Sequence, residues 1–306
     1  LKRRNSAATY NTFGGGMRMN AIEVKDLCKK IQSFQLKNIS FSVEQGTVMG
    51  LVGQNGAGKT SIINCILQLI KQDSGQIKLF NKEFHVNDIE IKQEIGVVFD
   101  TLQFPETMTG KDAASFYKSY YKKWDDLYFK QLTERLDVSI YKKIKDLSHG
   151  TKMKLAIALA MSYHPKLLIL DEPTSGLDPL ARDEILRILT GFMESEERAI
   201  LLSSHITSDL EKIADTITVI YEGEVLLSEA KDKLMYEYGL WRGSLLDSFE
   251  LPKHAILSKR ESAFGVDVLV NKSLVSSAIT LEIPELEDVI VMLTKAKHRE
   301  ELQKLL

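Results

Sequence analysis

Two stretches about 110 residues apart carry residue types that could bind and cleave a phosphoanhydride. The first, GQNGAGKT at residues 53–60, fits the pattern G-x-x-x-x-G-K-[ST] in full. Its glycines allow successive backbone N–H groups to wrap around phosphate oxygens, Lys59 would neutralise the β and γ phosphates, and the Thr60 hydroxyl would hold Mg²⁺. We expect the nucleotide contacts of this stretch to be Gly53, Asn55, Gly56, Ala57, Gly58, Lys59, Thr60 and Ser61.

The second stretch, LLILDE at residues 167–172, ends a buried apolar run with two carboxylates. Ligands of open α/β sheets bind at the carboxyl ends of the strands. Asp171 is therefore expected in the Mg²⁺ shell, through water, and Glu172 is placed to orient and deprotonate the attacking water.

A third stretch, LSHGTKMK at residues 147–154, opens a helical run that continues to Pro165. Ser148 can cap this helix, and Gly150 lets another group approach the backbone where the helix dipole favours an anion. Taken alone, the stretch fits either a phosphate contact or an ordinary capped helix.

Composition excludes several classes of protein. Of 306 residues, 44% are hydrophobic, and 40 basic residues nearly balance 42 acidic ones, so no global charge favours nucleic acid as a partner. Cys28 and Cys65 are too few for a disulfide framework, which favours a reducing cytosol and a packing role for both thiols. No apolar run is long enough to span a bilayer.

The order of elements predicts an α/β fold. Buried strands are expected at 47–53, 95–99, 167–170, 199–204 and 216–221, with shorter β runs at 21–24 and 39–46. A helix over 59–70 follows the glycine-rich loop, residues 105–163 form a helical insertion, and Glu222-Gly223 marks a hairpin. Residues 1–18 are expected to be an N-terminal extension, either a leader or an artificial addition, 19–230 the main domain, and 231–306 a small α+β accessory domain.

Together these motifs resemble the ATPase cassette of ABC transporters. TSGLD at 174–178 follows LLILDEP directly, LSHGT precedes it, and His205 follows AILLSS, all in the order of that family. The resemblance covers roughly residues 20–230. It implies a P-loop NTPase core with a mostly parallel sheet, an antiparallel β subdomain and a helical insertion. It also implies that two cassettes close head to tail around ATP.

The resemblance assigns further site residues. Ser148 and Gly150 would contact the γ-phosphate of ATP bound to the partner cassette, and Asp178 would carry contacts across the dimer. His205 matches the switch histidine, which joins Glu172 and Lys59 as a catalytic residue.

Three positions depart from the family pattern. His149 and Thr151 replace a glycine and the glutamine of LSGGQ, so His149 could aid anion contact, crowd it, or point outward. Asp100 takes the place of a metal-contacting glutamine, with Gln103 nearby in a loop that could be shifted. The aromatic that stacks on adenine falls at Ile31, so either Phe34 takes over or apolar contact suffices.

The resemblance implies a cytoplasmic ATPase held on the inner face of the membrane by a separate transmembrane subunit. It would pair with an identical or a different cassette, use ATP and Mg²⁺, and power export of a peptide, toxin or drug. The chain is similar to exporter ATPases of Gram-positive bacteria, including those that move phenol-soluble modulins. The expected docking surface consists of exposed apolar and aromatic residues of the helical insertion together with the loop near Asp100 to Met108, and Phe104 is the first candidate. The alternatives are a soluble ABC-type ATPase and a nucleotide-dependent regulatory module with little turnover.

Overall fold

A six-stranded sheet forms the centre of the molecule. The computed structural model describes residues 19–263 and 265–305, and the predicted extension 1–18 lies outside these residues. The strand order is β10-β9-β3-β8-β7-β6, and all neighbours are parallel except β10 against β9. The bounds are β3 Val48–Val52, β6 Ile95–Val98, β7 Leu167–Asp171, β8 Ala199–Ser204, β9 Thr216–Tyr221 and β10 Glu224–Ala230.

The central strands are apolar on both faces because both faces are covered. In β7, Leu168 and Leu170 join one core cluster with helices α5 and α6, whereas Leu167 and Ile169 join a second cluster with helix α1. This alternation follows the two-residue period of a strand. The helices are α1 Lys59–Ile66, α5 His149–Met161, α6 Pro179–Phe192 and α7 Thr207–Ile213.

A second, antiparallel sheet packs into the same core cluster as α1. Its order is β2-β1-β4-β5, with β1 Asn20–Ile31, β2 Phe34–Glu44, β4 Ser74–Leu79 and β5 Lys82–Glu83. The short helix α2 Ile89–Gln93 leads from it back to β6. Cys65 is buried here, and burial raises the pKa of its thiol to about 11, which confirms a packing role for this cysteine.

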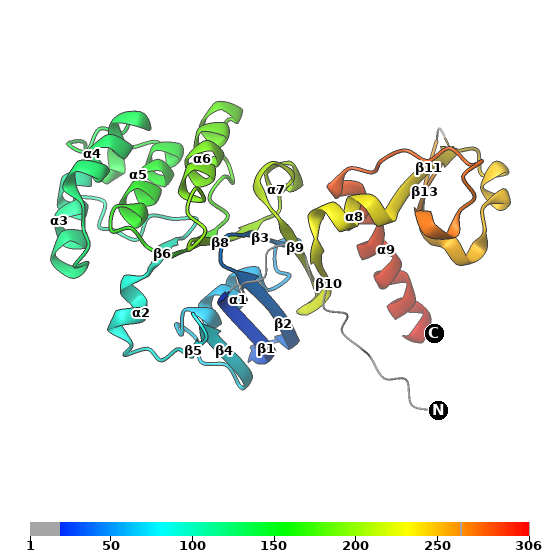
Figure 1. Cartoon of the computed structure of the whole chain (residues 1–306), viewed down its shortest axis with the longest axis horizontal. Helices are drawn as coiled ribbons and strands as arrows, with labels where there is room; N and C mark the ends of the chain where they lie inside the picture. Colours follow the sequence, from blue (N-terminus) through cyan, green and yellow to red (C-terminus); the bar gives the residue numbers. More distant parts are fainter. Residues whose placement is uncertain (1–18, 264, 306) are drawn as a thin grey trace.

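The helical insertion lies at the left of Figure 1. It contains α3 Gly110–Tyr120, α4 Asp126–Arg135, the short 3₁₀ segment Ile144–Asp146, and α5. Thr109 begins α3 with a capping box, in which its hydroxyl accepts from the Asp112 amide and the Asp112 carboxylate accepts from the Thr109 amide. No strand is assigned between Gly110 and Pro165 among the described residues, as predicted.

The C-terminal region forms its own three-stranded antiparallel sheet, ordered β11-β13-β12. Its elements are α8 Lys231–Glu237, β11 Tyr238–Gly243, β12 Ile256–Ser262, β13 Gly265–Asn271 and α9 Leu286–Leu305, with 3₁₀ segments at Asp247–Glu250, Lys253–Ala255 and Lys272–Leu274. Helix α9 packs against β12 and α7, and Leu286 and Ile290 belong to the main core cluster. The α+β composition is as expected, and a domain boundary at residue 231 stays a prediction.

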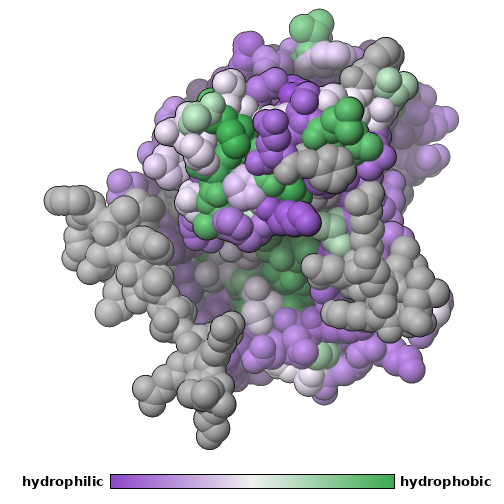
Figure 2. All heavy atoms as spheres, turned by 90° about the vertical axis from the view of Figure 1, so that its right-hand side faces the viewer, coloured by the Kyte–Doolittle hydropathy of each residue, from purple (hydrophilic) through white to green (hydrophobic). Residues whose placement is uncertain are grey.

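The end of the molecule formed by this region faces the viewer in Figure 2, where hydrophobic patches are separated by hydrophilic side chains. The exposed apolar side chains of the C-terminal region include Leu245, Leu246 and Ile283. Among the helices of the described residues, none is both long and apolar enough to cross a membrane.

The helix after the glycine-rich loop is shorter than predicted. It ends at Ile66 instead of continuing to residue 70. Gln68 adopts a left-handed φ of 56°, and the amides of Leu69 and Ile70 turn back to the Asn64 carbonyl. An apolar pattern alone does not report this turn, which leaves Leu69 63% exposed.

The predicted hairpin between β9 and β10 is observed, with positive φ at Glu222 and Gly223. The Gly223 amide donates to the Ala57 carbonyl at 3.1 Å, and its carbonyl accepts from the Lys37 amide at 2.8 Å. The hairpin thus joins the glycine-rich loop to β2. A Cβ atom at residue 223 would lie 2.0 Å from the Gln35 carbonyl oxygen.

We therefore expect Gly223→Ala to lower the free energy of unfolding by more than about 1 kcal/mol, since alanine resists a positive φ and would collide with backbone. Gly191→Ala in α6 is the control, because a Cβ there meets nothing within 4 Å and helical alanine is favoured by up to about 1 kcal/mol. Urea unfolding of both variants measures the difference. Equal stability of the two variants would contradict the prediction.

Candidate functional site

The glycine-rich loop lies between the end of β3 and the start of α1. Gly56 and Gly58 have positive φ values of 83° and 114°. A Cβ at Gly58 would lie 2.7 Å from the Leu36 side chain, and one at Gly53 would lie 2.6 Å from the Ile220 carbonyl oxygen. Close packing therefore excludes side chains from both positions, and the loop keeps the glycine backbone that phosphate-binding loops use.

Lys59 is buried at the start of α1, with 6% of its side chain exposed. Its Nζ donates to the Gly53 carbonyl at 2.7 Å and lies 3.1 Å from Oε1 of Glu172. Burial of an ammonium requires such partners, because desolvation disfavours the charge. The lysine of the first motif and the carboxylate of the second are therefore neighbours.

Thr60 and Asp171 are also brought together. The Thr60 hydroxyl donates to Asp171 Oδ2 at 2.8 Å, and the Ser203 hydroxyl donates to Oδ1 at 2.5 Å. Asp171 is 4% exposed and occupies the last position of β7. Two hydroxyls thus hold this carboxylate in one orientation beside the loop.

Glu172 has a left-handed φ of 53°, an uncommon conformation for a residue with a side chain. Its amide donates to the Ser203 hydroxyl at 3.1 Å, which holds the turn. Its Oε2 lies 2.7 Å from His205 Nδ1, and its buried Oε1, although 3.1 Å from Lys59 Nζ, has no donor aligned for a hydrogen bond. The three residues predicted to be catalytic therefore form one contact chain, with Glu172 between Lys59 and His205.

The donor set fits Mg²⁺ held partly by phosphate. Within the described part of the chain, no three His, Cys, Asp or Glu side chains are grouped so that they could hold a metal ion alone. Mg²⁺ commonly uses one or two protein oxygens together with waters and substrate phosphates. The Thr60 hydroxyl and the Asp171 carboxylate supply such oxygens next to the loop.

Asp100 is exposed after β6, and no hydrogen bond or ion pair joins it to another described residue. The Gln103 amide is used locally, donating to the Thr101 hydroxyl at 2.8 Å. A metal contact from Asp100 stays a prediction.

Ser148 caps α5, as the sequence predicts. Its hydroxyl accepts from the Thr151 amide at 3.1 Å and bonds the Thr151 hydroxyl at 2.8 Å. Asp178 caps α6, where its Oδ1 accepts from the Ala181 and Leu180 amides at 3.0 Å. The Ala181 amide, with that of Leu180, holds the pKa of the Asp178 carboxyl below its usual range.

The two capped helix starts lie against each other. A Cβ at Gly150 would lie 3.4 Å from the Leu177 side chain, and His149 Nε2 lies 3.1 Å from the Ser175 carbonyl oxygen. Because a carbonyl oxygen only accepts, Nε2 carries the proton in this contact. His149 therefore does not simply point outward. It bridges residues 147–151 to the 174–178 turn, a contact that glycine could not make.

Phe34 and Ile31 lie at the two ends of the β1–β2 turn. The Phe34 ring lies beside Gly58 and Gly223, and it lines a cavity of about 770 Å³ next to the glycine-rich loop. Ile31 is not among the lining residues. The geometry therefore favours Phe34 over Ile31 for contact with a base.

Some neighbours of the site were not predicted. Ser203 orients Asp171 and Glu172, and its only signal was a serine pair ending an apolar strand. Tyr221, and Thr294, Lys295 and His298 of α9, line the same cavity as Phe34. No sequence pattern connected α9 to the loop.

Comparison with known proteins identifies the family of this chain. Residues 36–175 match the ABC transporter family. The chain is 35% identical over 214 residues to the bacitracin transport ATP-binding protein BcrA of Bacillus licheniformis, covering 67% of this chain and 68% of BcrA. It is 33% identical over 198 residues to the lantibiotic transport ATP-binding protein SrtF of Streptococcus pyogenes, covering 64% and 85%. The chain belongs to the ABC transporter ATP-binding family.

Solved structures support the family fold. The structure of an ATP-binding subunit of an ABC transporter matches with a TM-score of 0.64 at 26% identity, covering 71% of this chain and 92% of that one. Family membership confirms the predicted P-loop ATPase cassette and the prediction of an enzyme that hydrolyses ATP. The roles of individual side chains stay predictions.

We expect His149→Gly to loosen the turn at residues 174–178, because it removes the contact to the Ser175 carbonyl. Hydrogen exchange should show the amides of this turn exchanging about 2- to 10-fold faster, the range of one lost hydrogen bond. His149→Gln, which retains an N–H donor, is the control and should keep most of the protection. Unchanged exchange in His149→Gly would show that the contact does not hold the turn.

Proposed function

We propose that this chain is the ATP-hydrolysing subunit of an exporter that moves a peptide antibiotic or a similar amphipathic compound through a separate transmembrane subunit. The observation that carries the ATPase assignment is the contact chain Lys59–Glu172–His205 beside the Thr60–Asp171 pair. Similarity to BcrA and SrtF, named for bacitracin and lantibiotic transport, supports the class of substrate.

In the proposed reaction, the loop amides and the Lys59 ammonium bind the phosphates, and Thr60 and Asp171 hold Mg²⁺. When bound, Mg²⁺ supplies positive charge to the β and γ phosphates. Glu172 takes the proton of the attacking water, for which its buried Oε1 is an available acceptor once the nearby ammonium turns to phosphate. His205 holds Oε2 and thereby orients the carboxylate.

The proposed working unit is a pair of cassettes, of two copies or of this chain and a sibling. The capped starts of α5 and α6 would close on the ATP of the opposite cassette, with Ser148 and Gly150 at its γ-phosphate and Asp178 alongside. Their mutual packing supports this role, since both elements would move together. The pair would lie at the inner face of the membrane, held by the transmembrane subunit.

An apolar groove supports a docking site for that subunit. Leu69, Val86 and Tyr120 are 63%, 54% and 45% exposed, and they line a cavity of about 210 Å³ with Phe99, the residue that follows β6. Phe104 is half-buried, with its ring 5.9 Å from that of Phe116 and 6.0 Å from that of Tyr117. We propose that an intracellular helix of the membrane subunit fills the groove, with the 100–108 loop beside it.

Glu172→Gln should leave ATP affinity nearly intact and slow hydrolysis on the order of 10²- to 10⁴-fold, because the amide cannot take the proton of water. Phosphate release and equilibrium nucleotide binding measure the two effects. ATP should also trap the paired cassettes of this variant, which light scattering would detect.

The matched control is Glu197→Gln, an exposed carboxylate paired with Lys166 just before β8, at the end of the sheet opposite the site. It should hydrolyse ATP at the unsubstituted rate. Normal turnover in Glu172→Gln would remove Glu172 as the base.

Val86→Asp should uncouple the cassette from its membrane subunit, since burying an unpaired carboxylate in an interface costs several kcal/mol. In the reconstituted complex, the transporter-stimulated ATPase rate should fall at least about tenfold, and the basal rate of the isolated chain should stay the same. Leu246→Asp, equally disruptive in type but on the C-terminal region, is the control. Full stimulation of Val86→Asp would place the docking site elsewhere.

A further inference from the structure

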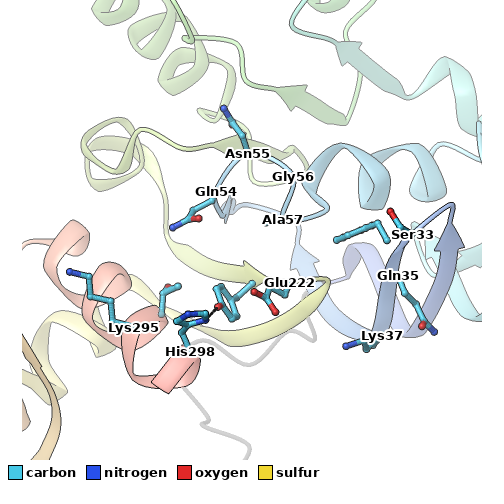
Figure 3. Close-up of a pocket in the computed structure, with 13 residues that line it drawn as sticks. Ser33, Gln35, Lys37, Gln54, Asn55, Gly56, Ala57, Glu222, Lys295 and His298 are labelled. Carbon is cyan, nitrogen blue, oxygen red and sulfur yellow. Dashed lines mark hydrogen bonds between the residues drawn. The ribbon is translucent and has the colours of Figure 1, made fainter. Parts of the chain in front are cut away.

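The C-terminal helix α9 shares a cavity with the glycine-rich loop (Figure 3). The cavity of about 770 Å³ is bounded by the loop at Gln54–Ala57, by Phe34 and its neighbours at the β1–β2 turn, by Tyr221 and Glu222, and by Thr294, Lys295 and His298 of α9. We propose that α9 forms one wall of the nucleotide pocket and contacts the base-and-ribose end of ATP. This inference rests on the proposed nucleotide site.

Helix α9 is fixed to the cassette by its first turns. Leu286 is fully buried and Ile290 is 7% exposed, both within the main core cluster. The Leu286 amide donates to Glu211 Oε1 at 2.5 Å, and the Thr207 hydroxyl donates to Glu287 Oε2 at 3.5 Å. Glu211 and Thr207 belong to α7, which begins two residues after His205, so the helix is anchored beside the catalytic contact chain.

A second set of contacts ties the exposed part of α9 to the loop. His298 Nδ1 and the Tyr221 hydroxyl are 2.8 Å apart. Tyr221 precedes the Glu222-Gly223 hairpin, whose Gly223 amide donates to the Ala57 carbonyl. His298 is therefore linked to the loop that would bind phosphate by the hydrogen bond to Tyr221, the chain from Tyr221 to Gly223, and the hydrogen bond from Gly223 to Ala57.

The lining indicates which part of a nucleotide enters this cavity. Of the loop, only Gln54–Ala57 line the cavity, whereas Lys59 and Thr60, which would hold the β and γ phosphates, do not. Phe34 offers an apolar ring on the wall nearest the loop. Ligand pockets in proteins typically have volumes of about 300–1,000 Å³ and combine apolar surface with a few polar groups. A cavity of this kind suits a base and a ribose.

The polar side chains of α9 that line the cavity could bind the polar groups of the base and the ribose. The Thr294 hydroxyl donates to the Ile290 carbonyl and can still accept from a ribose hydroxyl. His298 uses Nδ1 for Tyr221, which leaves Nε2 for a ribose hydroxyl or a ring nitrogen. The Lys295 ammonium forms no hydrogen bond or ion pair with any of residues 19–263 and 265–305, and it adds positive charge to this wall. All three lie on α9, beyond residue 230, where the resemblance to the cassette family ends, so the C-terminal region adds them to the site.

The test compares two ligands on the full-length protein. His298→Ala and the double variant Lys295→Ala/His298→Ala should bind ATP about 3- to 10-fold more weakly, the loss of one or two hydrogen bonds. Their affinity for inorganic tripolyphosphate, which lacks base and ribose, should not change. Lys59→Ala should weaken both ligands, because the ammonium serves the phosphates.

Lys297→Ala, on the same turn of α9 but outside the cavity lining, is the matched control and should bind both ligands normally. Tyr221→Phe removes one hydroxyl, and a moderate selective loss of ATP affinity is expected from it as well. Unchanged ATP binding in the His298 variants, or an equal loss of ATP and tripolyphosphate, would overturn the inference while leaving the proposed ATPase intact. Failure of the unsubstituted chain to bind ATP would instead overturn the proposed function itself.

Discussion

The parallel register of β3, β7 and β8 is the constraint on which the site depends. Asp171 pairs with Ser203, and Val52 pairs with Ser204, so the three strands end at one level. The segments that follow these strands therefore meet at one edge of the sheet. They are the glycine-rich loop after β3, Glu172 after β7 and His205 after β8. A shift of one strand by one residue would turn its side chains to the opposite face and separate the carboxylate from the hydroxyls that hold it.

Burial of charge makes this meeting energetically necessary. Lys59 is almost fully buried, and an isolated ammonium in that position would be costly. Glu172 balances it at 3.1 Å, and His205 holds the other oxygen of Glu172. In the proposed cycle the phosphates compete with Glu172 for the ammonium, so nucleotide binding and release of the base are one electrostatic event. The left-handed conformation of Glu172 is then a local strain held by the Ser203 contacts.

Two parts of the chain modify the shared cassette without changing its core. His149 fills a position that the family leaves to glycine and uses its ring to connect α5 to the turn before α6. Helix α9 packs its apolar face on the main core and presents Thr294, Lys295 and His298 to the cavity beside the loop. Both features lie outside the glycine-rich loop and the Thr60–Asp171 pair, and both change what surrounds them.

The sequence by itself determined the fold class, the P-loop, the carboxylate pair and the helix cap at Ser148. These features are local. Motif spacing, the periodicity of apolar residues and helix capping each depend on residues that lie close together in the sequence. The sequence did not predict the end of α1 at Ile66. The apolar pattern continues to residue 70, but the left-handed conformation of Gln68 turns the backbone out of the helix.

Only the tertiary structure decided the contacts between distant segments. The Lys59–Glu172 pair spans 113 residues, and Tyr221–His298 spans 77. Three further features depend on how strands and helices pack: the choice of Phe34 over Ile31 for base contact, the contact of His149 with Ser175, and the position of α9 beside the loop. The physical reason is that a motif fixes the geometry of its own backbone, whereas the partner of a side chain is set by which elements the shared core brings together.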